Sequence, residues 1–78
     1  MDNMIKQKID LHGVICPMNF VKTKLALEEL NPGDYLEVIL DEGDAILNVP
    51  RSLKDDGHTV VLVEHLGETF RVVVKKGE

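Results

Sequence analysis

With 78 residues and one cysteine, the chain fits a single domain over residues 1–78 that cannot contain an internal disulfide. The formal net charge of −5 and only three aromatic side chains (two Phe and one Tyr) exclude a stand-alone nucleic-acid binder, which needs clustered Lys and Arg and a base-stacking surface. No stretch reaches the roughly 20 apolar residues of a membrane span or has the pattern of a signal peptide, so we expect a cytoplasmic protein, in which a lone thiol stays reduced.

The first half of the chain predicts a strand, a helix and a second strand. Residues 5–11 alternate apolar and polar side chains, which is typical of a strand. A helix is expected from residue 17 to about residue 30, because Pro17 suits the first helical position and good helix formers follow it. The sequence Asn-Pro-Gly-Asp at 31–34 ends that helix as a turn, and residues 35–40 form the next strand.

The second half predicts another helix and a hairpin. Residues 44–56 have apolar side chains at helical spacing, but Pro50 is expected to interrupt them, giving a short first turn and a new start near the proline. Gly57 fits the C-terminal cap of this helix. Residues 59–65 and 69–75 are strands joined by a short glycine-containing turn, so we expect them to pair as a hairpin.

The order of these elements predicts the fold class. Right-handed crossovers place both helices on the same side of the sheet when the strands advance in one direction. Several strands alternate apolar and polar residues, as a sheet with one solvated face requires. We therefore expect an α+β protein: a two-layer sandwich of order βαβαββ, in which two helices cover one face of a mixed four-stranded sheet.

The stretch from Gly13 to Pro17, which contains Cys16, is the part of the sequence that indicates a chemical function. It places a cysteine where the first helix is expected to begin, and unpaired backbone N–H groups and the helix dipole favour an anion there. A thiolate in that position can accept a sulfur atom from a persulfide and pass it on, without metal or cofactor. The alternative is a small buried side chain, as free cysteines commonly are; the helix start and the glycine turn favour the chemical interpretation.

A series of short motifs along the chain supports this interpretation by its spacing. The motifs are Ile9-Asp10, Gly13, Cys16-Pro17, Asn31-Pro32-Gly33-Asp34, Asp44-Ala45, Val49-Pro50 and Gly57. Together they resemble the TusA (SirA-like) family of sulfur-carrier proteins over nearly the whole chain, from Ile9 to Lys76, with the elements in the same order. The Cys-Pro pair with its upstream glycine is the most specific part.

The resemblance implies a sulfurtransferase that carries sulfane sulfur as a persulfide on Cys16. It implies a cysteine desulfurase or rhodanese-type donor, and an acceptor protein in a sulfur relay such as tRNA thiolation, molybdenum-cofactor assembly or sulfur oxidation. Asp10, Gly13, Pro17 and Asn19 are then supporting residues of the motif. The family pattern is usually Cys-Pro-any-Pro, and Asn19 stands in place of the second proline, which leaves the partner and the subfamily open.

Other side chains near this stretch have simpler interpretations. His12 could act as a base beside the thiolate, but an exposed loop residue is favoured. Asp10 could brace the following loop by hydrogen bonds or only end the strand. The carboxylates at residues 41–44 are expected to form a solvated turn and a helix cap rather than a site. Met18 and Phe20 are expected in the core, although an exposed one could anchor a partner.

Two further hypotheses keep the same fold. The first is a non-catalytic regulatory or protein-interaction module, for which Asn19 is the supporting feature. The second is a redox- or selenium-linked thiol that reacts without passing sulfur onward. Replacement of Cys16 by alanine separates the first of these from a sulfur carrier, because an interaction module keeps its partner binding without the thiol.

Overall fold

The strands and helices follow one another in the predicted order. The structure, a computed structural model, describes residues 5–15 and 18–77. Neither helix in this part of the chain is long and apolar enough to cross a membrane. The elements are β1 (Ile5–Asp10), α1 (Met18–Glu28), β2 (Tyr35–Asp41), α2 (Asp44–Asp55), β3 (Thr59–His65) and β4 (Thr69–Lys75).

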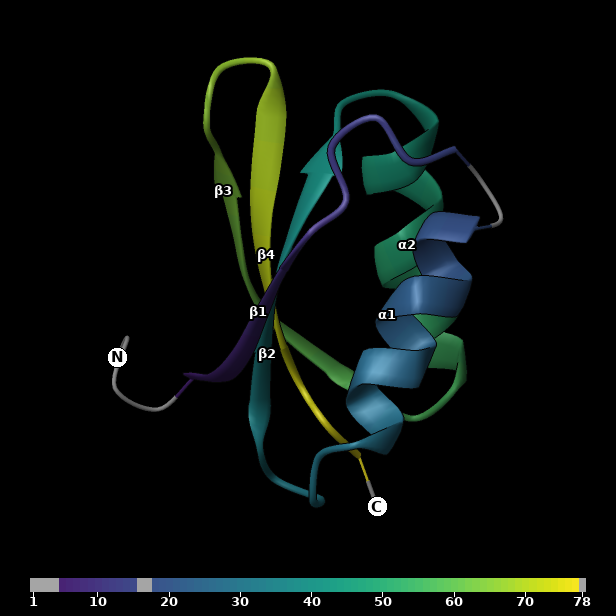
Figure 1. The fold of residues 1–78 in the computed structure, drawn as a ribbon, viewed down its shortest axis with the longest axis vertical. Helices are drawn as coiled ribbons and strands as arrows, with labels where there is room; N and C mark the ends of the chain where they lie inside the picture. The colour runs from purple at the N-terminus through teal and green to yellow at the C-terminus, as the bar shows by residue number, and fades with distance from the viewer. Residues whose placement is uncertain (1–4, 16–17, 78) are drawn as a thin grey trace.

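The four strands form one mixed sheet in the order β1-β2-β4-β3. β1 pairs with β2 in parallel, and β4 pairs antiparallel with both β2 and β3. Both helices lie against the same face of this sheet (Figure 1), as right-handed crossovers require. The α+β two-layer sandwich predicted from the sequence is thus confirmed.

The core fills the space between the sheet and the two helices. Alternation along β2 turns Leu36, Val38 and Leu40 toward the helices, where each is at most 1% exposed. Residues of β4, of both helices and of the loop after β1 complete this core, namely Leu11, Ala26, Leu27, Ala45, Val49, Leu53, Val72 and Val74. No helix among the described residues covers the other face of the sheet (Figure 1). The β1–α1 loop lies at the end of the molecule where it passes from the sheet to the helices.

Pro50 lies inside α2 without dividing it, so the predicted new start near this proline is wrong. A proline in a helix interior costs about 3 kcal/mol, through one lost backbone hydrogen bond and a clash with the preceding turn. Ala45, Val49 and Leu53 nevertheless form a continuous buried stripe on both sides of it. Burial of the two larger side chains contributes roughly 1.5–3 kcal/mol each, which is enough to hold one continuous helix.

Gly57 ends α2 as predicted. Its N–H donates to the carbonyl of Lys54 at 3.0 Å, and the N–H of His58 donates to the carbonyl of Leu53 at 3.0 Å. Gly57 has a φ of +94°, which closes this pair of bonds into a Schellman motif. The chain therefore leaves the helix sharply and enters β3.

The end of β4 packs closely against this turn. The N–H of Gly77 donates to Nδ1 of His58 at 3.0 Å, and a Cβ on Gly77 would lie 1.9 Å from the carbonyl oxygen of Gly57. The N–H of Gly33 donates to the carbonyl of Lys76 at 2.9 Å. The chain after β4 is thus bound to the turns on either side of it.

Candidate functional site

The loop between β1 and α1 is fixed to the end of β2 by backbone bonds. The N–H of Leu11 donates to the carbonyl of Ile39 at 3.0 Å, which continues the pairing of the two strands by one residue. The loop then turns, with the N–H of Val14 donating to the carbonyl of Leu11 at 3.0 Å. Gly13 has a φ of +81° in this turn, a conformation that costs other residues roughly 1–2 kcal/mol.

Two carboxylates at the ends of neighbouring strands hold the same loop. Oδ1 of Asp10 accepts the N–H of His12 at 2.9 Å, and Oδ2 of Asp41 accepts the N–H of Gly13 at 2.8 Å. Nε2 of His12, which is exposed as predicted for a loop residue, lies 3.5 Å from Oδ1 of Asp41. The C-terminal ends of parallel strands meet at one edge of a sheet, so β1 and β2 bring both carboxylates to this loop.

The contact between Asp41 and the loop is not predicted by the sequence. The sequence predicts a solvated turn and a helix cap for the carboxylates at residues 41–44, but Gly43 occupies the N-cap position of α2 and no side chain caps it. The carboxylate of Asp41 instead reaches a residue 28 positions away in the sequence. The parallel pairing of the first two strands could have predicted this contact, because it places the C-terminal ends of both strands side by side.

Asn19 is buried in the first turn of α1. Its side chain is 1% exposed, and its Oδ1 accepts the N–H of Phe20 at 2.7 Å. Its own N–H donates to the carbonyl of Ile15 at 3.2 Å, and its carbonyl accepts Oγ1 of Thr23 at 2.8 Å. Two of these bonds, the one from its N–H and the one to its Oδ1, could not be made by a proline at this position.

Cys16 and Pro17 lie outside the described residues, so the predictions made for them stay predictions. The residues on either side of them are described. Ile15 is 76% exposed, and Met18, the first residue of α1, is exposed as well. Met18 is thus not part of the core, whereas Phe20 packs against the core as expected.

A shallow pocket of about 380 Å³ opens beside this loop. Its described lining is apolar or acidic apart from Asn19, and consists of Val14, Ile15, Asn19, Asp41, Glu42, Asp44 and Ala45. No lysine or arginine belongs to this lining. The carboxylates of this lining favour a cationic group in the pocket. They disfavour an additional anion there, because like charges disfavour each other's ionised form.

Comparison with known proteins shows which protein family the chain belongs to. A family model described as Sulfurtransferase TusA matches residues 7–76. The chain belongs to this family. The "Putative sulfur carrier protein MJ0990" of Methanocaldococcus jannaschii is 49% identical over 70 residues, which cover 90% of this chain and 93% of that protein. "Putative sulfur carrier protein YedF" of Escherichia coli K12 is 32% identical over 77 residues, covering 97% of this chain and 100% of YedF.

Solved structures share the fold of this TusA family member. A SirA-like protein from Desulfitobacterium hafniense has a TM-score of 0.78 and 26% identity, and the match covers 92% of this chain and 99% of that one. HP1264 from Helicobacter pylori has a TM-score of 0.74 at 20% identity, covering 91% of this chain and 97% of that one. The first supports the family assignment and the second the fold alone.

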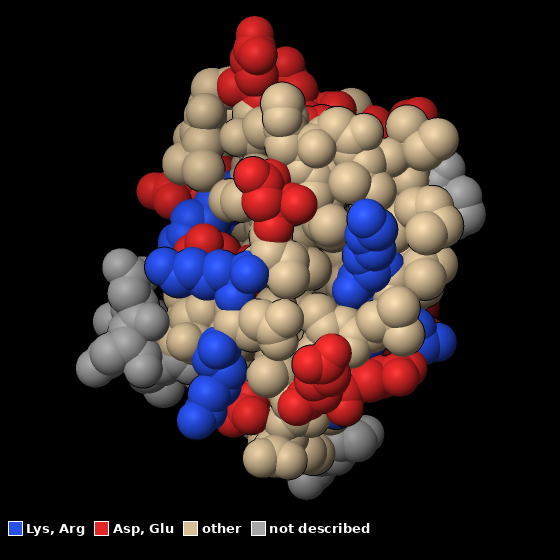
Figure 2. Space-filling model, in the orientation of Figure 1, with Lys and Arg blue, Asp and Glu red and all other residues tan. Residues whose placement is uncertain are grey.

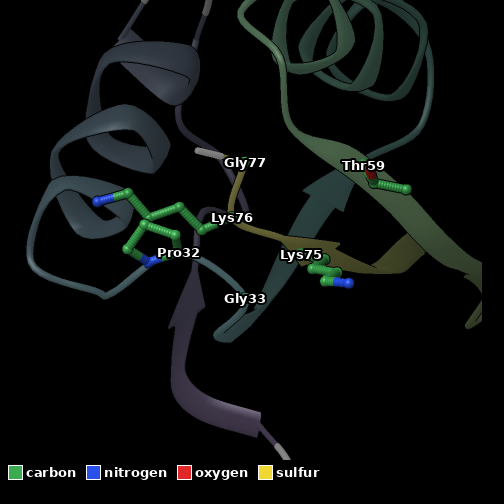
Figure 3. Close-up of a pocket in the computed structure, with 6 residues that line it drawn as sticks. All are labelled: Pro32, Gly33, Thr59, Lys75, Lys76 and Gly77. Carbon is green, nitrogen blue, oxygen red and sulfur yellow. The ribbon is translucent and has the colours of Figure 1, made fainter.

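The TusA domain has another pocket, of about 350 Å³, at the opposite end of the sheet, and its lining includes Lys75 and Lys76. The two lysine side chains point away from each other (Figure 3). Nζ of Lys76 donates to the carbonyl of Leu30 at 2.6 Å, just after α1, so its charge is used within the fold. No group of three His, Cys, Asp or Glu side chains within residues 5–15 and 18–77 could hold a metal ion.

Proposed function

We propose that this TusA family member is a sulfur carrier that receives sulfane sulfur as a persulfide on Cys16 and passes it to a partner protein. The observation that supports this most is the braced loop of residues 11–15, which leads directly into the only cysteine of the chain. Cys16 follows Ile15 directly in the sequence. Since Ile15 is 76% exposed, this end of the loop is open to a partner.

The proposed transfer exchanges one S–S bond for another and needs no external oxidant. The thiolate Sγ of Cys16 attacks the outer sulfur of the donor's persulfide, so an S–S bond forms on Cys16 while the donor's own S–S bond breaks. The inner sulfur of the donor leaves as a thiolate. An acceptor nucleophile then attacks the outer sulfur on Cys16, and the thiolate of Cys16 departs with the electron pair of the broken bond.

The partners follow from this chemistry. The donor must present a persulfide, so we propose a cysteine desulfurase or a rhodanese-type protein. The acceptor is a further protein of a sulfur relay, such as one that leads to tRNA thiolation. The carrier works in the cytoplasm, where a single thiol stays reduced between transfers. The names of the relatives from M. jannaschii and E. coli support the carrier role.

A mass measurement tests the proposal. The purified chain, incubated with inorganic polysulfide or with a cysteine desulfurase and L-cysteine, is expected to gain the mass of one sulfur atom. The gain should be lost on treatment with a reducing thiol. Peptide mapping is expected to place the sulfur on Cys16, and Cys16→Ala should abolish the gain.

An unchanged mass of the wild-type chain with both sulfur sources would contradict the proposal. A mass gain that persists in Cys16→Ala would contradict it equally, because no other residue of the chain carries a thiol. If Cys16→Ala keeps full function in a complementation assay, the non-catalytic interaction module is the better description.

A further inference from the structure

Two histidine side chains face carboxylates of the same turn, residues 41–44, which joins β2 to α2. Nε2 of His12, in the β1–α1 loop, lies 3.5 Å from Oδ1 of Asp41. Nε2 of His65, the last residue of β3, lies 3.8 Å from Oε2 of Glu42. Two segments that are distant in the sequence therefore each bring one imidazole to this turn.

The two imidazoles are held in place by different contacts. Gly13, the residue after His12, donates its N–H to Oδ2 of Asp41 at 2.8 Å, which keeps the imidazole beside this carboxylate. The ring of His65 stacks on Phe70 with the ring centroids 4.6 Å apart, and Phe70 packs against the core. Both histidine side chains are more than half exposed, at 63% and 57%, so they can exchange protons with solvent.

The end of the molecule that contains these histidines, here called the acidic end, has an excess of carboxylates. Figure 2 shows acidic side chains and no lysine or arginine at the top of the molecule, where Figure 1 places the β1–α1 loop, the β2–α2 turn and the β3–β4 turn. Within residues 11–15, 41–44 and 65–68, only His12 and His65 can carry a positive side-chain charge. The carboxylates of these segments and of the adjoining end of β1 belong to Asp10, Asp41, Glu42, Asp44 and Glu68.

The histidines are the side chains that can change the charge of the acidic end near neutral pH. Histidine is the side chain whose charge ordinarily changes between about pH 5 and pH 8, whereas carboxylates, lysine and arginine ordinarily keep theirs. Glu64, next to His65 on β3, lies 3.6 Å from Nη1 of Arg71, whose Nε also donates to Glu37. The nearest arginine of the sheet is thus paired with carboxylates of its own.

We propose that His12 and His65 determine how readily Cys16 accepts sulfur from small anions, a proposal that rests on its carrier function. Uncharged histidines leave the carboxylates of the acidic end without compensation, which slows the approach of an anionic source such as inorganic polysulfide. Protonated histidines offset Asp41 and Glu42 and speed it. The thiolate of Cys16 attacks a sulfur atom of the polysulfide, an S–S bond forms on Cys16, and the shorter polysulfide leaves with the electron pair of the broken S–S bond.

Two alkylating reagents that differ mainly in charge test the role of the histidines. Anionic iodoacetate and neutral iodoacetamide both react with the thiolate, so the ratio of their rates cancels the thiolate fraction and reports the charge around Cys16. The ratio of iodoacetate to iodoacetamide is measured between about pH 5.5 and about pH 8, at an ionic strength of about 0.01 M, where screening is weak.

The variants change the charge of the histidines in both directions. The double variant His12→Gln with His65→Gln is neutral at these positions at every pH, and the double variant His12→Lys with His65→Lys is positive. His58→Gln is the matched control, because His58 precedes β3 and lies roughly 20 Å from His65, the length of a seven-residue strand.

In the wild type, the ratio is expected to rise about two- to threefold as the pH falls from about 8 to about 5.5. His58→Gln should show the same rise. The glutamine double variant should stay near the wild-type ratio of the alkaline limit, and the lysine double variant near that of the acid limit. Loading from inorganic polysulfide at about pH 8 should be faster in the lysine double variant by the same factor.

A flat ratio in the wild type would overturn the role of the histidines while leaving the carrier function intact. An equal rise in the glutamine double variant would overturn it as well, because the effect would then belong to another titrating group. So would a rise that His58→Gln abolishes. If the ratio changes as expected but neither polysulfide nor a cysteine desulfurase adds sulfur to Cys16, the carrier function itself is overturned.

Discussion

At the scale of single residues, the loop before Cys16 depends on one carboxylate contributed from a distant part of the sequence. Asp41 follows the last core residue of β2, and its Oδ2 accepts the N–H of Gly13 at 2.8 Å. A hydrogen bond with a charged acceptor contributes roughly 1.5–3 kcal/mol when it is protected from water. The Asp41 side chain is 34% exposed, so solvent reduces that contribution to about 1 kcal/mol.

Asp41→Ala is expected to lower the free energy of unfolding by about 1 kcal/mol and to speed amide exchange at Gly13, because the acceptor is lost. Asp41→Asn keeps an oxygen in place and is expected to retain most of the stability and protection. It should also speed alkylation of Cys16 by neutral iodoacetamide, since removal of a carboxylate from the loop that leads to Cys16 favours the thiolate. Urea unfolding, hydrogen exchange and alkylation rates measure these effects. Identical losses in both variants would show that Asp41 does not act as an acceptor.

At the scale of elements, α2 shows how burial overrides a local signal. Pro50 predicts a break in the helix, because proline has no backbone N–H to donate and its ring clashes with the preceding turn. The break does not form because Val49 and Leu53 are both buried against the sheet. The proline keeps its intrinsic cost even so. The helix is held by its buried face rather than by its backbone bonds alone.

Pro50→Ala is therefore expected to raise the free energy of unfolding by about 1–2 kcal/mol, somewhat less than the full interior proline cost because the half-buried ring loses its own packing. For a chain of this size that gain raises the Tm by about 4–8 °C per kcal/mol. Asn48→Ala, an exposed site in the same helix, serves as the control and should gain no more than about 0.7 kcal/mol. A lower Tm for Pro50→Ala would mean that the ring's packing outweighs the missing hydrogen bond.

The elements themselves could be predicted because their signals are local. Runs of apolar, mainly β-branched residues around a glycine turn predicted the bounds of β3 and β4, and Gly57 predicted the end of α2. The contact between Asp41 and Gly13 could not be read from local spacing, because it depends on which strands are neighbours. The burial of Asn19 and Thr23 in α1 was not predicted, for a related reason. Helix propensity does not say which face is buried, and Asn19 fits the core only because its bonds are made within the helix.

At the scale of the whole molecule, the charge of −5 is unevenly distributed. The end with the β1–α1 loop carries carboxylates without neighbouring lysine or arginine, whereas Lys75 and Lys76 lie at the other end of β4. An uneven field of this kind changes the rate at which charged reactants meet the protein more than it changes the fold. Small anions and basic proteins should therefore respond to salt in opposite directions.

Loading of Cys16 by anionic polysulfide is expected to become about two- to fivefold faster as the ionic strength rises from about 0.01 M to 1 M, over which the screening length falls from about 30 Å to 3 Å. Loading by a protein donor that has a basic surface should become slower, because salt screens its attraction to the acidic end of the carrier. Alkylation by neutral iodoacetamide serves as the reference and should hardly change. A polysulfide rate that falls with salt would show that positive charge, rather than the carboxylates, dominates the surroundings of the thiol.

The direction of the strands has a practical consequence for tethering this protein. Ile5 begins β1, and Gly77 follows β4, whose last residue pairs with the first residue of β2. Both described ends of the chain therefore leave from the end of the sheet opposite residues 11–15, roughly 20 Å away for a strand of six residues. A fluorescent reporter, an affinity handle or a second enzyme fused beyond either of these residues projects away from the acidic end. Such fusions should leave the approach to the loop unobstructed.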